Sequence, residues 1–112
     1  MENFFHQQLS DRKAETAAAV VALRLPEGGC PVIQVGSSGV IIGINGGTHA
    51  DYDNGCIAGI SNDESVVAVN IKKRGKSGLW LYVSPVAPGT TSVYVKTTDG
   101  RVRSNECAVT VI

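Results

Sequence analysis

The 112-residue chain carries ten basic and ten acidic residues, so its formal net charge is zero. This balance leaves no global field that would draw the protein to nucleic acid or to a membrane, and we expect neither as a partner. The length fits one domain with one small core. The thirteen glycines favour short strands joined by tight turns. The aromatic content of only 5% argues against aromatic surfaces on which nucleic-acid bases would stack.

The first 16 residues are polar and contain no glycine or proline. They carry both phenylalanines, and Leu9 follows Phe5 by one helical turn, with Phe4 beside them. We treat residues 1–16 as an N-terminal arm with two open interpretations. It is either a frayed terminus or a segment that orders when it docks on a partner through Phe4, Phe5 and Leu9. The apolar run "TAAAVVAL" that follows is too short for a membrane span, and charged residues before it argue against a signal peptide.

In residues 17–112 apolar runs alternate with turn residues, and this pattern predicts a single β-domain. Seven or eight short strands at this spacing are typical of a sandwich or barrel. The expected strands cover residues 18–25, the start of 31–39, 40–47, 56–62, 66–71, 79–86 and two arms of a C-terminal hairpin. The segments 48–55 and 72–78 are expected to be loops.

The C-terminal hairpin has the clearest pattern in the chain. Val93 and Val95 alternate with polar or aromatic residues, and residues 107–111 alternate in the same way. Asp99 and Gly100 lie between the two runs and tolerate the positive φ angles that a tight reversal requires. The alternation predicts one buried and one exposed face for each arm.

Several short matches after residue 18 occur in the order of one known family. The run "VVALRLP" ends in proline, and Val35-Gly36 leads into the next strand. The later matches are "SNDESVVAVN", "VAPGTTSVYV", the turn Thr98-Asp99-Gly100 and the final alternation of Cys107, Val109 and Val111. This order resembles the bacterial immunoglobulin-like group 2 domain, the module of invasin and intimin type. Ile60 stands where family members carry tryptophan, and the connection "KKRGKSGLWLYV" is longer than theirs.

The resemblance implies an all-β fold, an immunoglobulin-like Greek-key sandwich of about seven strands. It implies a binding or structural role and carries no catalytic residues. Modules of this kind occur in bacterial surface adhesins and as appended domains on tailed-phage capsid, decoration and tail proteins.

The sequence contains no motif in which catalytic or metal-binding side chains have the required spacing. His6 and His49 are far apart, and no Gly-x-Ser-x-Gly nucleophile motif accompanies them. Asp51 and Asp53 lie in a segment that lacks the glycine and glutamate of a calcium-binding loop. We therefore expect no catalytic residues, no metal and no cofactor.

The three cysteines, Cys30, Cys56 and Cys107, lack the Cys-x-x-Cys spacing of redox and zinc motifs. Buried cysteine often acts as a small hydrophobic residue, which is the role we favour here over a disulfide. The disulfide state of the three residues stays open.

Two neighbouring features are the candidate contact residues of the domain. The basic run, Lys72, Lys73, Arg74 and Lys76, is either a solvated loop that protects a sheet edge or a contact for phosphate, an anionic sugar or an acidic protein.

The second feature is the strand that follows, in which Trp80 and Tyr82 share one face and Leu79, Leu81 and Val83 the other. One of the two faces must form the core. The other is covered by a loop, by the arm or by a partner.

These observations lead to a non-enzymatic virion structural protein of a tailed phage as the main hypothesis. It would act as a capsid decoration, head or tail protein, assembled in the host cytoplasm. Its partners would be a major capsid or tail protein, or neighbouring copies of itself, with weak carbohydrate binding in addition. The alternative is an immunoglobulin-like adhesin module of a bacterial cell surface.

Overall fold

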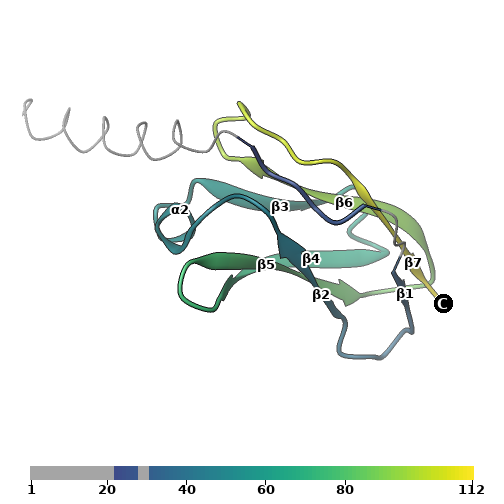
Figure 1. Ribbon diagram of the computed structural model, residues 1–112. Helices are drawn as coiled ribbons and strands as arrows, with labels where there is room; N and C mark the ends of the chain where they lie inside the picture. The colour runs from purple at the N-terminus through teal and green to yellow at the C-terminus, as the bar shows by residue number, and fades with distance from the viewer. Residues whose placement is uncertain (1–21, 28–30) are drawn as a thin grey trace, which may run out of the picture.

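The computed structural model describes residues 22–27 and 31–112, and Figure 1 shows these residues as two sheets packed face to face. The predicted arm, residues 1–16, lies outside the described residues. In the described part of the chain there are seven strands and one short helix. They are β1 (Val32–Ile33), β2 (Val40–Ile44), α2 (His49–Asp53), β3 (Ile57–Ser61), β4 (Val67–Arg74), β5 (Gly78–Pro85), β6 (Gly89–Thr97) and β7 (Cys107–Val111). Within these ranges no helix is long and apolar enough to cross a membrane.

The strand order confirms the predicted fold class. One sheet has the order β1-β7-β6-β3, and the other has the order β2-β5-β4. Pairing between strands is antiparallel except for β1, which runs parallel to β7. The chain changes sheets between β1 and β2, β2 and β3, β3 and β4, and β5 and β6, while β4–β5 and β6–β7 are hairpins within one sheet. This is a Greek-key arrangement of the immunoglobulin-like type. The protein is an all-β, immunoglobulin-like sandwich.

The first described segment crosses from one sheet to the other. Arg24 exchanges two backbone hydrogen bonds with Asn45, each 2.8 Å long, at the free edge of β2. Pro26 then lacks the N–H that would continue this ladder, and β1 pairs with β7 in the opposite sheet. The prediction of a strand over 18–25 is therefore wrong for its described part, which contributes one isolated bridge.

The side-chain amide of Asn105 fixes this crossing. Its Oδ1 accepts from the Leu25 N–H at 2.9 Å, and its Nδ2 donates to the Leu25 carbonyl at 3.1 Å. Leu25 is 2% exposed, so its backbone groups have little access to water as an alternative partner. The two bonds replace the sheet pairing that the segment lacks between β2 and β1.

Asn105→Ala is expected to lower the free energy of unfolding by about 2 kcal/mol, because buried backbone groups lose both partners. Equilibrium denaturation of the two proteins measures the difference. Asn62→Ala is the matched control, since Asn62 is also an amide but its hydrogen bonds are exposed. We expect a change within about 0.5 kcal/mol for this control. An equal loss in both variants would contradict the role given to Asn105.

The core lies between the two sheets and follows the predicted alternation. Leu79, Leu81 and Val83 of β5 are fully buried, as are Val93 and Val95 of β6. Val109 and Val111 of β7 complete the opposite wall. Cys56 and Cys107 are 0% and 6% exposed, which agrees with their predicted role as small core residues, while Cys30 lies outside the described residues.

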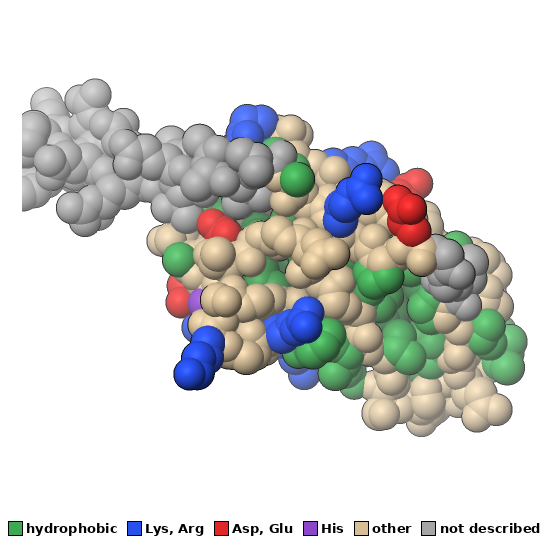
Figure 2. Space-filling model, in the orientation of Figure 1, with side chains coloured by type: hydrophobic (Ala, Val, Ile, Leu, Met, Phe, Trp, Pro, Cys, Tyr) green, Lys and Arg blue, Asp and Glu red, His purple; other side chains and the backbone are tan. Residues whose placement is uncertain are grey.

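Exposed apolar residues occur together at the end where β1 runs beside β7. Val32 and Val35 are 61% and 48% exposed, and Ile112 is 60% exposed. The Val35 N–H donates to the Ile112 carbonyl at 2.9 Å, which keeps the two residues side by side. Figure 2 shows hydrophobic side chains concentrated toward the end of the molecule that holds residue 112 in Figure 1.

The segment 48–55, predicted to be a loop, contains the helix α2. Thr48 and Asp51 form a capping box, in which the Asp51 N–H donates to the Thr48 hydroxyl and the Thr48 N–H donates to the Asp51 carboxylate at 2.7 Å. A threonine followed three residues later by an acidic residue is a helix-start signal, which the loop prediction overlooked. The helix packs at the end of the sandwich, where its His49 N–H donates to the Ser77 carbonyl.

The segment 72–78 is not a loop either. Lys72 to Arg74 belong to β4, Arg74 pairs with Gly78, and only the three residues between them form the turn. Gly75 begins this turn with a φ of 54°, a left-handed conformation that glycine adopts without steric cost. Strand residues can be charged where one face of a sheet is open to solvent, so the basic run did not by itself define a loop.

The C-terminal hairpin is confirmed, with one irregularity in its second arm. Val93 pairs with Cys107 and Lys96 pairs with Arg103, so three steps on β6 face four steps on the other arm. The extra residue is a β-bulge. Ser104 restores the lost pairing, because its N–H donates to the Val95 carbonyl at 2.8 Å and its hydroxyl accepts from the Val95 N–H at 2.9 Å.

The turn of this hairpin is held by Asp99. The Thr97 hydroxyl donates to its carboxylate at 2.6 Å and the Arg101 N–H donates to it at 2.9 Å. These hydrogen bonds favour the charged form and keep the pKa of Asp99 below its ordinary value of 3.8. The stabilisation by Asp99 is therefore fully present above the unfolded-state pKa and disappears as the pH falls through the lowered folded-state pKa.

Asp99→Asn tests this pH dependence. The difference in the free energy of unfolding between the wild type and the variant is expected to be constant above about pH 5 and to shrink progressively below about pH 4. Denaturant titrations at a series of pH values give this difference directly. A difference that stays the same from neutral to strongly acidic pH would show that the carboxylate charge has no part in the turn.

Candidate interaction surface

The outer face of the β2-β5-β4 sheet brings the predicted aromatic residues together with part of the basic run. Because Leu79, Leu81 and Val83 point into the core, Trp80 and Tyr82 point outward. The aliphatic face of β5 therefore forms the core and the aromatic face lies on the outside, a choice that the sequence alone left open. We call this surface the aromatic sheet face, and it comprises Ile41, Gly43, Asn70, Lys72, Arg74, Trp80 and Tyr82.

Each outward aromatic ring on this face lies under a cation. The Arg74 Cζ is 4.5 Å from the centroid of the Trp80 ring, and the Lys72 Nζ is 4.4 Å from that of Tyr82. Both are diagonal neighbours across the β4–β5 pair, since Lys72 is directly opposite Trp80. Cation–π attraction at exposed sites is worth about 0.5–1 kcal/mol, enough to favour one arrangement of these long side chains.

Two further contacts keep the rings in place. The Tyr82 hydroxyl donates to the Ser38 carbonyl in the loop before β2. Gly43 is the cross-strand neighbour of Trp80. A Cβ at Gly43 would lie 3.4 Å from the Arg74 Nη1 and 3.5 Å from the Trp80 Cζ3, so the absence of a side chain leaves room for the stacked pair.

The aromatic sheet face is positive without a balancing acid. The described residues contain four ion pairs, and neither Lys72 nor Arg74 takes part in one of them. No member of the face is acidic. The Arg74 and Lys72 side chains thus present N–H donors whose charge is offset only by solvent and by the rings beneath them.

The rest of the predicted basic run does not join this face. Lys73 points to the other side of β4, where its Nζ is 2.8 Å from the Asp53 Oδ1 and 5.8 Å from the Tyr52 ring centroid. This pair ties α2 to the sheet. Lys76 lies in the exposed β4–β5 turn. The basic run is therefore not one loop tip, as expected from the sequence. Two of its cations lie on the aromatic sheet face, Lys73 forms an ion pair and Lys76 lies in the turn, because neighbouring side chains of a strand point to opposite sides.

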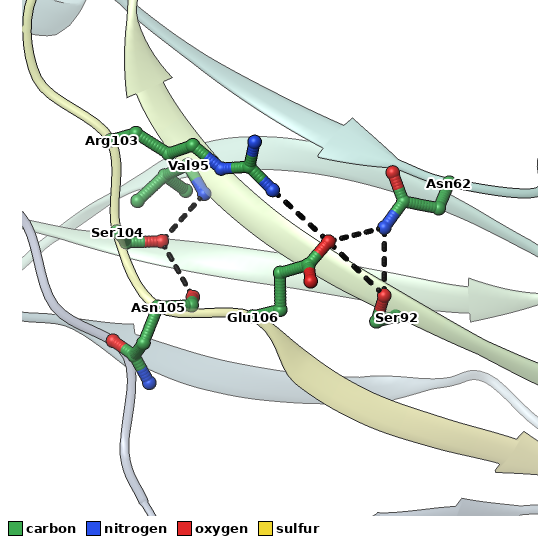
Figure 3. Close-up of polar contacts among 7 residues, drawn as sticks. All are labelled: Asn62, Ser92, Val95, Arg103, Ser104, Asn105 and Glu106. Atoms are coloured by element: carbon green, nitrogen blue, oxygen red, sulfur yellow. Dashed lines mark hydrogen bonds and ion pairs between the residues drawn. The ribbon is translucent and has the colours of Figure 1, made fainter.

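The opposite sheet carries a polar network that the sequence did not predict. Figure 3 shows Glu106 accepting from Asn62 and Ser92 and lying beside Arg103, whose Nη2 is 3.1 Å from the Glu106 Oε1. The Arg103 guanidinium also lies 3.9 Å above the Tyr94 ring. These groups satisfy one another across β3, β6 and the bulge, so the network holds the bulge to the sheet. The spacing Arg-x-x-Glu after a turn was its only sequence signal.

The remaining candidates for chemistry have structural contacts. The Asp51 carboxylate is buried in the capping box, and Asp53 pairs with Lys73. The His49 Nε2 lies 3.2 Å from the Arg74 carbonyl. Among the described residues no group of three histidine, cysteine or acidic side chains is arranged to hold a metal ion. The predicted anchors Phe4, Phe5 and Leu9 lie outside the described residues, so docking by the arm stays a prediction.

Comparison with solved structures finds the same fold in a bacterial surface-layer protein. Domains 4 and 5 of the S-layer protein SbsC match with a TM-score of 0.61 and 16% identity, over 83% of this chain and 46% of that one. The S-layer protein rSbsC(31-844) matches with a TM-score of 0.58 and 17% identity, over 81% of this chain and 12% of that one. SbsC domains 4-9 match with a TM-score of 0.59 and 17% identity, over 83% and 14%.

The chain therefore spans less than half the length of each of these structures. No family model matches the sequence, and no curated protein matches it. At these identities the likeness is one of fold: the chain has the architecture of individual domains found in a bacterial S-layer protein.

Proposed function

We propose that the protein is a non-enzymatic structural module of a bacterial cell surface, built on a domain of the bacterial immunoglobulin-like group 2 type. The observation that carries this proposal is the match of over four-fifths of the chain to S-layer protein domains. It favours the surface alternative over the virion hypothesis, for which no comparison reported above offers support. Fold likeness by itself gives no function, so the module's own surfaces must agree with the role.

The distribution of polar groups supports a structural role. The buried carboxylate of Asp51 belongs to the capping box of α2, and the buried hydroxyl of Ser104 accepts a backbone hydrogen bond at the bulge. The Glu106 carboxylate interacts with three neighbouring side chains. Catalytic groups, in contrast, converge on a cleft, and the pKa values of their side chains are shifted from the ordinary ones. Exposed apolar residues at the β1–β7 end, Val32 and Val35, suit contact with a neighbouring protein unit.

Fractionation of the native source tests the proposal. The protein is expected in the cell-envelope fraction, accessible to an antibody or to protease on intact cells, and released by agents that dissociate surface layers. A cytoplasmic chaperone serves as the control for cell integrity. Recovery in purified phage particles, or in the cytoplasm together with the chaperone, would overturn the proposal.

A further inference from the structure

We propose that the aromatic sheet face binds an acidic polysaccharide, a chain of sugars that carry carboxylate groups. The residues that would contact it are Asn70, Lys72 and Arg74 of β4, with Trp80 and Tyr82 beneath the cations. The inference deepens the proposed function and rests on it, because a module at a bacterial surface is in contact with such polymers.

The first step is the row of donors along β4. Asn70, Lys72 and Arg74 are alternate residues, and all three side chains are exposed on the same side of the sheet. At about 3.3 Å per residue, the row extends about 13 Å. A row of this length suits several units of an extended polymer better than one small molecule.

The second step is that the donors have no acceptor in the described part of the chain. Lys72 and Arg74 take part in none of its ion pairs. The Asn70 Oδ1 accepts from the Ile71 N–H at 3.0 Å, which fixes the amide and leaves its Nδ2 for another acceptor. Two cations suit carboxylates, and a neutral amide suits a hydroxyl or carbonyl oxygen. A uronic sugar supplies both kinds of oxygen.

The third step is that the cations are already held in position. The stacking of Arg74 on Trp80 and of Lys72 on Tyr82 restricts two side chains that would otherwise lose rotamer freedom on binding. Gly43 keeps the space beside Trp80 open, and the Tyr82 hydroxyl is bonded to Ser38. The rings therefore hold the two cations in position without occupying their N–H donors, which stay available to a ligand.

A polysaccharide fits this face better than a folded protein does. Ile41, at 55% exposed, is the one large aliphatic side chain on the face, and the aromatic rings lie under cations. Tryptophan, tyrosine and arginine are common anchors of protein interfaces, but here both rings are already covered by cations and cannot enter a pocket of a partner. An extended acidic chain needs only regularly spaced charges and hydrogen-bond acceptors.

The fluorescence of Trp80 offers a direct test, because it is the only tryptophan of the chain. The full chain is titrated with polygalacturonate at low ionic strength, with dextran as the neutral polysaccharide. We expect a saturable fluorescence change with polygalacturonate that is lost at about 1 M salt, where screening acts within about 3 Å, and no change with dextran. Absence of binding, or an equal response to dextran, overturns the inference.

Matched variants separate this face from non-specific charge attraction. Arg74→Gln is expected to weaken polygalacturonate binding about tenfold, the size of one charge-assisted contact. Lys96→Gln removes one charge from β6, in the opposite sheet, and is expected to change binding less than about twofold at a moderate salt concentration. Because Arg74→Gln alters the surroundings of Trp80, affinity electrophoresis in polygalacturonate gels provides a second readout. Thermal unfolding confirms that both variants are folded, and equal weakening by both overturns the inference.

Two other polyanions decide the class of ligand. Poly-L-glutamate carries the same carboxylates without sugar hydroxyls, and a single-stranded thymidine oligonucleotide carries phosphates. Asn70→Ala is expected to weaken polygalacturonate binding about fivefold and to weaken poly-L-glutamate binding less, because the polypeptide has no sugar hydroxyls. Tighter binding of poly-L-glutamate would indicate an acidic protein partner, tighter binding of the oligonucleotide a nucleic acid, and either result overturns the inference. Envelope localisation together with absent polygalacturonate binding would remove this inference and leave the proposed function standing.

Discussion

Replacing Leu81 with alanine is expected to lower the free energy of unfolding by about 3 kcal/mol, within the range for leucine deletions in cores. Leu81 is fully buried at the centre of β5, between β2 and β4. It reaches the opposite sheet, since a Cβ built on Gly59 of β3 would lie 2.8 Å from the Leu81 Cδ1. Its truncation removes contacts with both sheets and opens a cavity that neither can fill by moving alone. Chemical denaturation followed by Trp80 fluorescence measures the loss.

Val86→Ala is the control for this experiment, because Val86 is also aliphatic and is 50% exposed. Its effect is expected to stay within about 0.5 kcal/mol. Small domains have a total stability of about 5–15 kcal/mol, so the Leu81 variant should remain folded in buffer and unfold at a clearly lower denaturant concentration. Similar midpoints for both variants would mean that the sheets do not pack through Leu81.

Replacing Gly46 with alanine is expected to cost about 3 kcal/mol or more. Gly46 has a φ of 87°, and an added Cβ would lie 2.1 Å from the carbonyl oxygen of Ala22. That oxygen belongs to the backbone, so the clash can be relieved only by moving the first described segment away from β2. The movement would strain the paired hydrogen bonds of Arg24 and Asn45 beside it. The expected cost combines the conformational penalty with the loss of part of this pairing.

Gly55→Ala separates the two contributions. Gly55 has a φ of 67°, and nothing lies within 4 Å of an added Cβ. Its replacement should therefore cost only the conformational penalty, about 1 kcal/mol. The difference between the two variants in equilibrium unfolding measures the steric part. Equal costs would show that residue 22 can move away freely and that the crossing segment contributes little to stability.

Local patterns predicted the C-terminal half of the fold well. The alternation of Val93, Val95 and residues 107–111, with Asp99-Gly100 between them, gave the last two strands and their buried faces. The bulge at Ser104 was not predicted, because a single extra residue leaves the alternation of each arm intact. Its stabilisation is tertiary: the Ser104 hydroxyl accepts from the Val95 N–H that the irregular ladder leaves open, and the side-chain network around Glu106 lies beside the bulge.

Predictions were less reliable where a local signal competed with tertiary packing. The Thr48–Asp51 capping box was present in the sequence, yet a helix of five residues is stable only because it packs on the end of the sandwich. The basic run indicated a loop because lysine is common in loops. It is strand because one face of β4 is open, and because Arg74 and Lys72 cover aromatic rings of the next strand.

The fold class, the hairpin, most strand positions and the shared face of Trp80 and Tyr82 follow from local patterns in the sequence, because alternation and turn residues act over a few neighbouring positions. Which face of β5 forms the core, and which cations lie beside the rings, depends on contacts between distant parts of the chain. Those outcomes depend on the opposing sheet, which buries Leu79, Leu81 and Val83, and on cross-strand register, which places Lys72 and Arg74 over the aromatic pair and directs Lys73 toward α2.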